Sequence, residues 1–269
     1  MDDMMVIGTD CQPTMVLGDR TDEKAKLILG DVGGDTNEAY ESGKKSKYDE
    51  FWDAIQQNGE RNDYSYAFCN TNYEGIYPKY PIVAEKAMYM FMGCSKLKDA
   101  SNIVIDITAV KPNMMYVCSN CNSMIKAPIF NYIHAPIVKT YTSMYAGCYY
   151  LTAVSVYWGD GSQDAITQRN ACQNMFFKCW SLTDIYFGGE ETGSPTGLDL
   201  SYAKELTVAS VQSLLSSLKT IPAGSAGKYE IILATLTIEK LTNEILEGFA
   251  QKGWTIKSET RENTTESEE

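Results

Sequence analysis

One short pattern of apolar and polar positions recurs four times between Tyr89 and Phe187, and the rest of the chain is arranged around it. Each copy has an aromatic residue or a thiol, then two residues, a Cys, two more residues, and Leu or Met. The central Cys residues are 27, 27 and 31 positions apart, at Cys94, Cys121, Cys148 and Cys179. A regular period of this size indicates a repeat architecture in which one small unit stacks on its copies.

The repeated positions are expected to form interior rows, because each coil must bury its apolar residues against the coils on either side. A free Cys suits such a row, since it is a small and readily buried hydrophobe. The expected rows consist of Phe91, Cys94, Leu97, Cys121, Met124, Tyr145, Cys148, Leu151, Phe176, Cys179 and Leu182.

A short apolar run follows each of the last three copies. The runs at 151–156 and 182–187 alternate apolar and polar residues, which predicts a strand with one buried face. A third run covers 124–129. One coil is therefore expected to contain a turn with the Cys, a short strand and a return loop. The predicted fold is an α/β solenoid of short coils over residues 89–206, with helical caps at both ends.

The segment before the repeats predicts a helix from Ser46 to Gly59. Ser46 can cap it, and Tyr48, Phe51, Trp52 and Ile55 fall on one apolar face. Residues 46–88 are expected to form a helical leader that covers the first coil.

The segment 207–256 is expected to close the other end of the stack. Thr207 and Thr242 each precede a helical pattern, strand patterns begin at Tyr229 and Trp254, and Gly253 ends the second helix. From Lys257 the tail 257–269 has no apolar residue and is expected to be disordered.

Residues 1–45 show a weak pattern, in which two apolar triplets at 15–17 and 27–29 are possible strands. They are too short to build a core of their own. This N-terminal arm is therefore expected either to be loosely ordered or to dock on a partner or on a second copy of the chain.

Three stretches carry a family resemblance. Residues 90–97, 144–152 and 175–183 read MFMGCSKL, MYAGCYYLT and MFFKCWSLT. They resemble the leucine-rich repeats of the bacterial surface-antigen type, often called BspA-like, whose pattern is MFxGCxxLTxLDLS. The copy at Cys118 departs from it, with a thiol in the aromatic place. The resemblance covers about residues 85–256, and 43–82 resembles the leader of such repeats in phage and prophage proteins of gut Firmicutes.

Composition narrows the classes of function. The 269 residues carry a net charge of -12, which argues against a nucleic-acid partner. There is no apolar run of 18 residues and no signal-peptide pattern at Met1, so no membrane insertion is expected. The expected location is the cytoplasm on synthesis and then a virion, as the resemblance to phage and prophage proteins implies.

No catalytic or cofactor constellation stands out, so we expect no enzyme and no cofactor. His134 is the only His, and Cys118-x-x-Cys121 is half of a zinc pattern with no second half. The stretch 158–162 lacks the further acids of a calcium loop, and the pair Glu190-Glu191 in a Gly-rich stretch is typical of a solvated turn.

Four rings beside or after the Cys turns are candidates for ligand contact: Tyr149, Tyr150, Trp158 and Trp180. The alternative is that they pack between coils. The resemblance favours a non-enzymatic phage structural protein that attaches to a host-surface protein or glycan or to a neighbouring virion subunit. A bacterial surface or effector-like binding protein is the alternative, and a glycan-processing enzyme is a third, weaker class.

Overall fold

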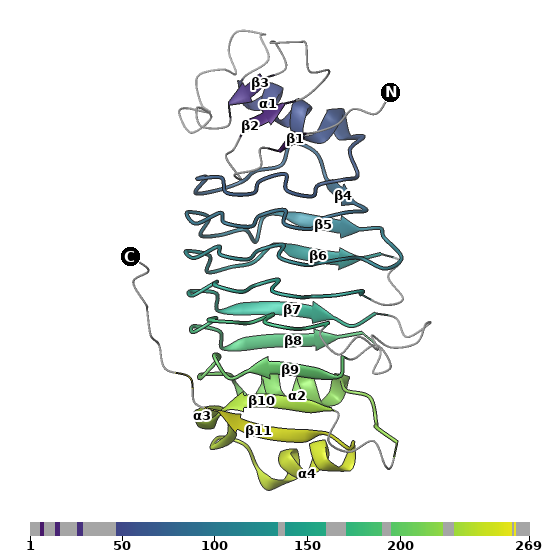
Figure 1. Ribbon diagram of the computed structural model, residues 1–269, viewed down its shortest axis with the longest axis vertical. Coiled ribbons are helices and arrows are strands. Elements are labelled where there is room, and N and C mark those ends of the chain that lie inside the picture. The colour runs from purple at the N-terminus through teal and green to yellow at the C-terminus, as the bar shows by residue number, and fades with distance from the viewer. Residues whose placement is uncertain are drawn as a thin grey trace.

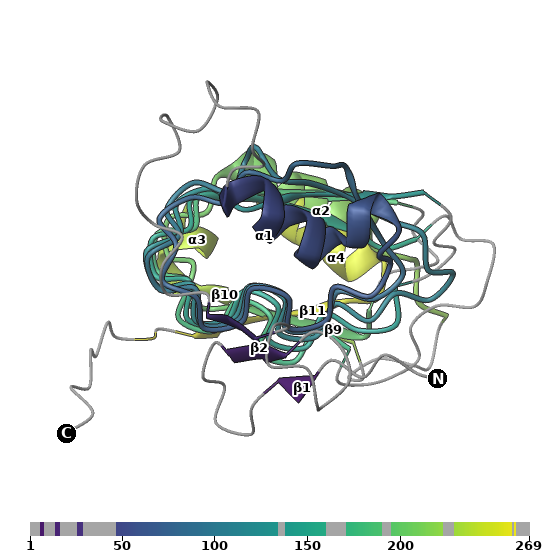
Figure 2. The same ribbon diagram turned by 90° about the horizontal axis from the view of Figure 1, so that it is seen from above.

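The computed structural model describes residues 6–7, 14–16, 26–28, 47–133, 138–159, 171–189, 195–222, 229–259 and 261. Within these ranges the chain winds in successive coils that lie one on another, as Figure 1 shows. Seen along the stack, each coil is a flattened ring (Figure 2). Helices α1 (Lys47–Gln56), α2 (Val208–Ser217) and α4 (Asn243–Gln251) line one long side, and strands β9 (Gly197–Leu200), β10 (Glu230–Ala234) and β11 (Thr255–Glu259) line the other.

Five eight-residue turn segments form one side of the ring, which we name the turn wall: 64–71, 87–94, 114–121, 141–148 and 172–179. Their first, fourth, fifth and eighth residues are all buried, as Ala87, Met90, Phe91 and Cys94 show for the second segment. This spacing is the one expected of a helix, but the segments are not helical, because their N–H groups bond to the next coil.

Hydrogen bonds between successive turn segments follow one rule. From the third position of the first four segments, the N–H groups at odd positions donate to carbonyls of the following coil, while most of those at even positions turn back within their own segment. In the first segment Tyr66 N–H donates to Met88 O (3.0 Å) and Phe68 N–H to Met90 O (2.8 Å). The same bonds recur down to the fifth segment, where Gly147 N–H donates to Phe177 O (2.8 Å). Few backbone donors are therefore left unpaired inside this wall.

Each turn segment bends through a left-handed backbone conformation at its third and seventh residues. At the seventh position φ is +74° at Gly93 and +77° at Gly147, which explains the Gly of the repeated phrase. Asn70 and Asn120 take the same place with φ of 56° and 58°, since Asn tolerates this conformation. The fifth segment has Lys178 there, with φ of 58°, at a cost of roughly 1–2 kcal/mol.

Strands form the second side of the ring, which we name the strand wall: β4 (Ile82–Ala84), β5 (Val104–Ile107), β6 (Ile129–Tyr132), β7 (Ala153–Tyr157) and β8 (Asp184–Gly188). All pairs are parallel, but they make two separate sheets, β4-β5-β6 and β7-β8. Figure 1 shows the wider spacing between β6 and β7. In the described part of the chain, the β-bridge at this break joins Lys126, which precedes β6, to Ala153 of β7.

The break has a cause in the sequence. After Lys126 the chain continues with Pro128, which has no N–H group to donate to a ladder. As a result, β6 pairs with β5 and not with β7. The inward residues of β6, Phe130 and Tyr132, are only half-buried, whereas Val154 and Val156 of β7 are buried.

The N-terminal cap is helix α1 followed by a short 3-10 turn, η3 (Gln57–Gly59). Phe51, Trp52 and Ile55 are buried, and the Trp52 ring lies 5.7 Å from that of Phe68. Asn58 and Gly59 take positive φ, so the helix ends where its sequence indicated. This part of the prediction is confirmed.

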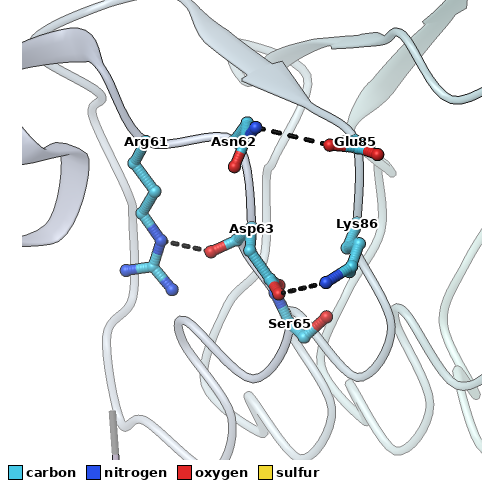
Figure 3. A network of polar contacts seen from close by, with 6 residues as sticks. All are labelled: Arg61, Asn62, Asp63, Ser65, Glu85 and Lys86. Carbon is cyan, nitrogen blue, oxygen red and sulfur yellow. Dashed lines mark hydrogen bonds and ion pairs between the residues drawn. The ribbon is translucent and has the colours of Figure 1, made fainter. Parts of the chain in front are cut away.

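Polar contacts tie the cap to the first coils (Figure 3). The buried guanidinium of Arg61 donates to the carbonyls of Ile55 (2.9 Å) and Asp63. Burial lowers the pKa of Arg61 from its usual value. The Asp63 carboxylate pairs with Lys86 on the next coil at 3.2 Å.

The C-terminal cap covers the last strand of the strand wall with helix α2. Thr207 caps this helix by accepting from the Ser210 N–H, as the sequence predicted. The N–H groups of Ile185 and Phe187 in β8 donate to the hydroxyls of Ser210 (2.9 Å) and Ser213 (3.0 Å). The side chains of α2 therefore occupy donors that a further strand would otherwise take.

The remainder of this cap alternates strands and helices. β10 pairs in parallel with β9 and β11, and α3 (Thr235–Ile238) and α4 follow β10. Thr242 accepts from the Ile245 N–H and caps α4, as predicted. Residues 257–259 belong to β11, so the tail boundary predicted at Lys257 is wrong by three residues, because pairing with β10 continues through Glu259.

The sequence interpretation also placed the start of the repeats too late. Residues 64–71 form a turn segment like the others, with Phe68 in the aromatic place and Thr71 in the Cys place. The short antiparallel strands β1 (Val6–Ile7), β2 (Thr14–Val16) and β3 (Lys26–Ile28) fall in the arm at 1–45. The rest of the arm, His134, 160–162, Glu190-Glu191 and the end of the tail lie outside the described residues.

Candidate binding surfaces

The four repeated Cys residues lie in the interior with no exposed surface. Each thiol donates to the carbonyl of the fifth residue of the preceding turn segment. The four bonds run from Cys94 to Phe68 (2.9 Å), from Cys121 to Phe91 (3.0 Å), from Cys148 to Cys118 (3.0 Å) and from Cys179 to Tyr145 (3.1 Å). Cys thus combines small apolar bulk with a weak donor that satisfies a buried carbonyl.

The thiol row packs and forms hydrogen bonds in the interior of the coils. Burial raises the pKa of Cys121 and of Cys179 well above the usual thiol value, which keeps both protonated. The seven Cys residues in the described ranges are all buried thiols. The other predicted ladder positions, Phe91, Leu97, Met124, Tyr145, Leu151, Phe176 and Leu182, are buried as well.

The four rings proposed for ligand contact have different surroundings. Trp158 is fully buried, and its indole N–H donates to the Ser217 hydroxyl at 3.0 Å, so its assignment to a contact loop is wrong. It follows β7 in the inward phase of Val154 and Val156, which explains why it points inward. Tyr150 is 59% exposed, and Tyr149 and Trp180 are half-buried.

Trp180 belongs to a cluster that we name the ring-and-cation edge: Phe177, Lys178, Trp180, Tyr202, Lys204 and Arg261. The Tyr202 ring lies 4.9 Å from both Phe177 and Trp180, edge-on to each. Phe177 is 36% exposed, and the other two rings are half-buried. Trp180 is the one residue of this group that its sequence position marked as a candidate, since Tyr202 and Arg261 come from distant segments.

Each ring of this edge has a cation beside it. Lys178 lies 5.4 Å from the centre of Phe177, Lys204 lies 5.6 Å from Trp180, and the Arg261 guanidinium lies 5.3 Å from Tyr202. Arg261 also pairs with Glu259 at 2.8 Å. Burial raises the pKa of Tyr202, and Arg261 opposes that shift.

A second surface lies over the break in the strand wall, and we name it the seam. Two adjacent depressions of about 350 Å³ and about 370 Å³ share Phe130, Ser155 and Tyr186 in their lining. Tyr186 is 67% exposed and Ile129 is 47% exposed. The rings of Tyr132 and Tyr157 stack at one end of the seam, with centres 5.2 Å apart.

The backbone at the seam has open hydrogen-bonding edges. In β7 the even-numbered residues bond to β8, as Trp158 N–H does to Gly188 O (3.0 Å), so the groups of Ser155 face the other way. In β6 the odd-numbered residues bond to β5, as Ile129 N–H does to Ile103 O (2.9 Å), so those of Phe130 face β7. No described backbone group pairs with Ser155 or Phe130 across the seam.

Two further findings concern classes of site. Across the described ranges, no three His, Cys, Asp or Glu side chains come together in a way that could hold a metal ion. None of the helices in the same ranges has both the length and the apolar character of a membrane span.

Compared with known proteins, the chain matches no protein-family model, no curated protein and no solved structure.

Proposed function

We propose that this chain is a non-enzymatic binding protein, built as an α/β solenoid of the leucine-rich-repeat kind, that docks a protein partner on the seam of its strand wall. The setting we propose is a phage particle, where the partner is a neighbouring subunit. That setting rests on the sequence resemblance of residues 43–82 and 85–256.

The observation that carries the proposal is the pair of open strand edges at the seam. Phe130 and Ser155 present backbone donors and acceptors on either side of a hollow, next to exposed apolar side chains such as Ile129. An extended peptide can use such edges by adding its own backbone hydrogen bonds, with side-chain pockets that supply specificity. Asp184 lines one depression and Asp106 lies beside the other, while Lys126 at the end of the seam is paired with Asp99, which favours a partner segment with a basic residue.

The strand wall suits this role because the seam interrupts it between two sheets. At the C-terminal end β8 is covered by α2 and its serine hydroxyls, and β4, β5 and β6 pair with one another. The seam thus gives a partner strand edges next to exposed side chains.

The test uses the proteins encoded by the genes next to this one, each titrated against the purified chain by calorimetry. One of them should bind. Tyr186→Ala removes the most exposed ring of the seam and should weaken that binding at least about tenfold. The matched control is Val83→Ala, which truncates an exposed apolar side chain of β4 away from the seam and should leave binding unchanged.

A backbone variant separates the strand edge from the side chains. Ser155→Pro removes the one N–H of this residue, which faces the seam, and leaves the hydrogen bonds between β7 and β8 in place. It should weaken binding with little change in the far-ultraviolet circular dichroism. Full binding by both Tyr186→Ala and Ser155→Pro would place the interface elsewhere, and no binding by any neighbouring gene product would contradict the phage setting.

A further inference from the structure

Lys178, one of the turn-wall residues with positive φ, lies in the ring-and-cation edge. Four of the five turn segments have Gly or Asn at their seventh position, where φ is positive, and the fifth has Lys178. Gly or Asn would adopt this conformation more easily, so Lys178 is kept there at a cost in stability. Strained residues cluster at functional sites, where a side chain is needed for something other than the fold.

The charge balance of the edge is unusual for this chain. The protein carries a net charge of -12, yet three cations gather over three neighbouring rings. Arg261 is compensated by Glu259 and Asp199, at 2.8 Å and 3.9 Å. Among the described residues, no carboxylate forms an ion pair with Lys178 or Lys204, whose ammonium groups lie over the rings of Phe177 and Trp180.

We propose that the ring-and-cation edge binds a sugar chain that carries carboxylate groups, a second site independent of the seam. The exposed parts of the Phe177 and Trp180 rings offer apolar surface for the C–H face of a sugar ring, and the two lysines that lie over these rings reach its carboxylates.

A phosphate-bearing ligand fits less well. Phosphate recognition favours the bidentate fork of Arg, and Arg261, the Arg of this edge, is already held by two carboxylates. Lysine is a point charge on a flexible stem, which suits single carboxylates spaced along a chain.

The test titrates the full-length chain with three probes: an oligogalacturonate, a neutral malto-oligosaccharide of the same length, and an oligoglutamate peptide. The oligogalacturonate should bind and the neutral sugar should not. Trp180→Ala should weaken oligogalacturonate binding at least about tenfold. The control Lys96→Ala removes an exposed lysine at the same edge of an earlier coil, and it should leave binding unchanged.

Lys178→Gly is the decisive variant, because the proposal predicts opposite changes in two measurements. It should raise the midpoint of thermal unfolding by relieving the strain at positive φ, and it should weaken oligogalacturonate binding about tenfold. A merely structural lysine would change only the midpoint.

Three results would overturn the proposal: no binding of oligogalacturonate, unchanged affinity in Lys178→Gly, or binding of oligoglutamate that is as tight as that of the sugar. The last would identify an acidic peptide as the ligand. None of these results bears on the seam, since Tyr186 and Ser155 lie on the other wall.

Discussion

The turn wall and the strand wall are made by the same coils, yet one is regular and the other is broken. In the turn wall, five segments of equal length repeat the same backbone bonds and the same two left-handed positions. In the strand wall, β6 and β7 part after Pro128. The coils therefore repeat closely where the backbone must adopt left-handed conformations. They vary where the chain forms ordinary strands.

The difference also separates structure from candidate function. A residue at a left-handed position or in the thiol row has little freedom to change, because its neighbours in the next coil meet it directly. Outward residues of the strand wall meet solvent, as Tyr186 does with 67% of its surface exposed. The candidate sites accordingly lie where a wall departs from its repeat: at the seam, and at Lys178.

The largest expected effect is on a residue that serves both walls. Leu151 is fully buried at the corner between the fourth turn segment and β7. Leu151→Ala should lower the free energy of unfolding by about 2–5 kcal/mol, through lost burial and a cavity. Denaturant unfolding measures it. The control Leu236→Ala, at a side chain that is 47% exposed, should change stability by less than about 0.5 kcal/mol.

A smaller effect is expected when the turn wall alone is altered. Gly147→Ala forces a side chain onto a residue with φ of +77°, and its Cβ would lie 2.4 Å from Oδ1 of Asn120. We expect a loss of about 1–3 kcal/mol. In an Asn120→Gly background the contact with Oδ1 is absent. The loss of stability should then be smaller, because only the strain of Ala at a positive φ remains. Equal losses in both backgrounds would show that the coils do not meet at this point.

The smallest expected effect is on the pH dependence of the free energy of unfolding. Burial raises the pKa of the Cys179 thiol, so the folded state keeps a proton that the unfolded state loses above about pH 9. Stability present at neutral pH should therefore fall as the pH rises past that value, by at most about 1.4 kcal/mol per pH unit for each such thiol.

Cys179→Ala should make this alkaline decline less steep, measured by denaturant unfolding between pH 8 and about 10. Ser119→Ala is the control, because it changes a buried side chain that does not ionise. An unchanged slope in Cys179→Ala would mean that this thiol titrates normally in the folded protein.

Much of the fold could be read from the chain, because the inward positions of the coils repeat. Thr207 and Thr242 cap the helices that their patterns indicated, and β7 and β8 follow the alternating runs. The first turn segment escaped notice because Thr71 replaces Cys and Glu74 stands in the place of Leu. A search for the eight-residue spacing of buried positions would have found it.

The candidate surfaces were harder to predict. Trp158 could have been placed correctly, since it continues the two-residue alternation of Val154 and Val156. Pro128 was a visible signal for the seam, but the width of the opening depends on how two coils diverge in space. The ring-and-cation edge joins the segments 177–180 and 202–204 with Arg261, and only the folded chain brings them together.

Because the hydrogen bonds of the turn wall are the same from coil to coil, repeat units can be added without a change in these bonds. Cys94, Cys121 and Cys148 are spaced by the same 27 residues, and each coil presents to the next the bonds that it receives from the one before. Duplication of one such unit would lengthen the stack by about one strand spacing, roughly 4.8 Å, while α1 and α2 still closed the two ends. The distance between molecules bound at the two ends of the stack would thus change during evolution by one coil spacing for each repeat unit gained or lost.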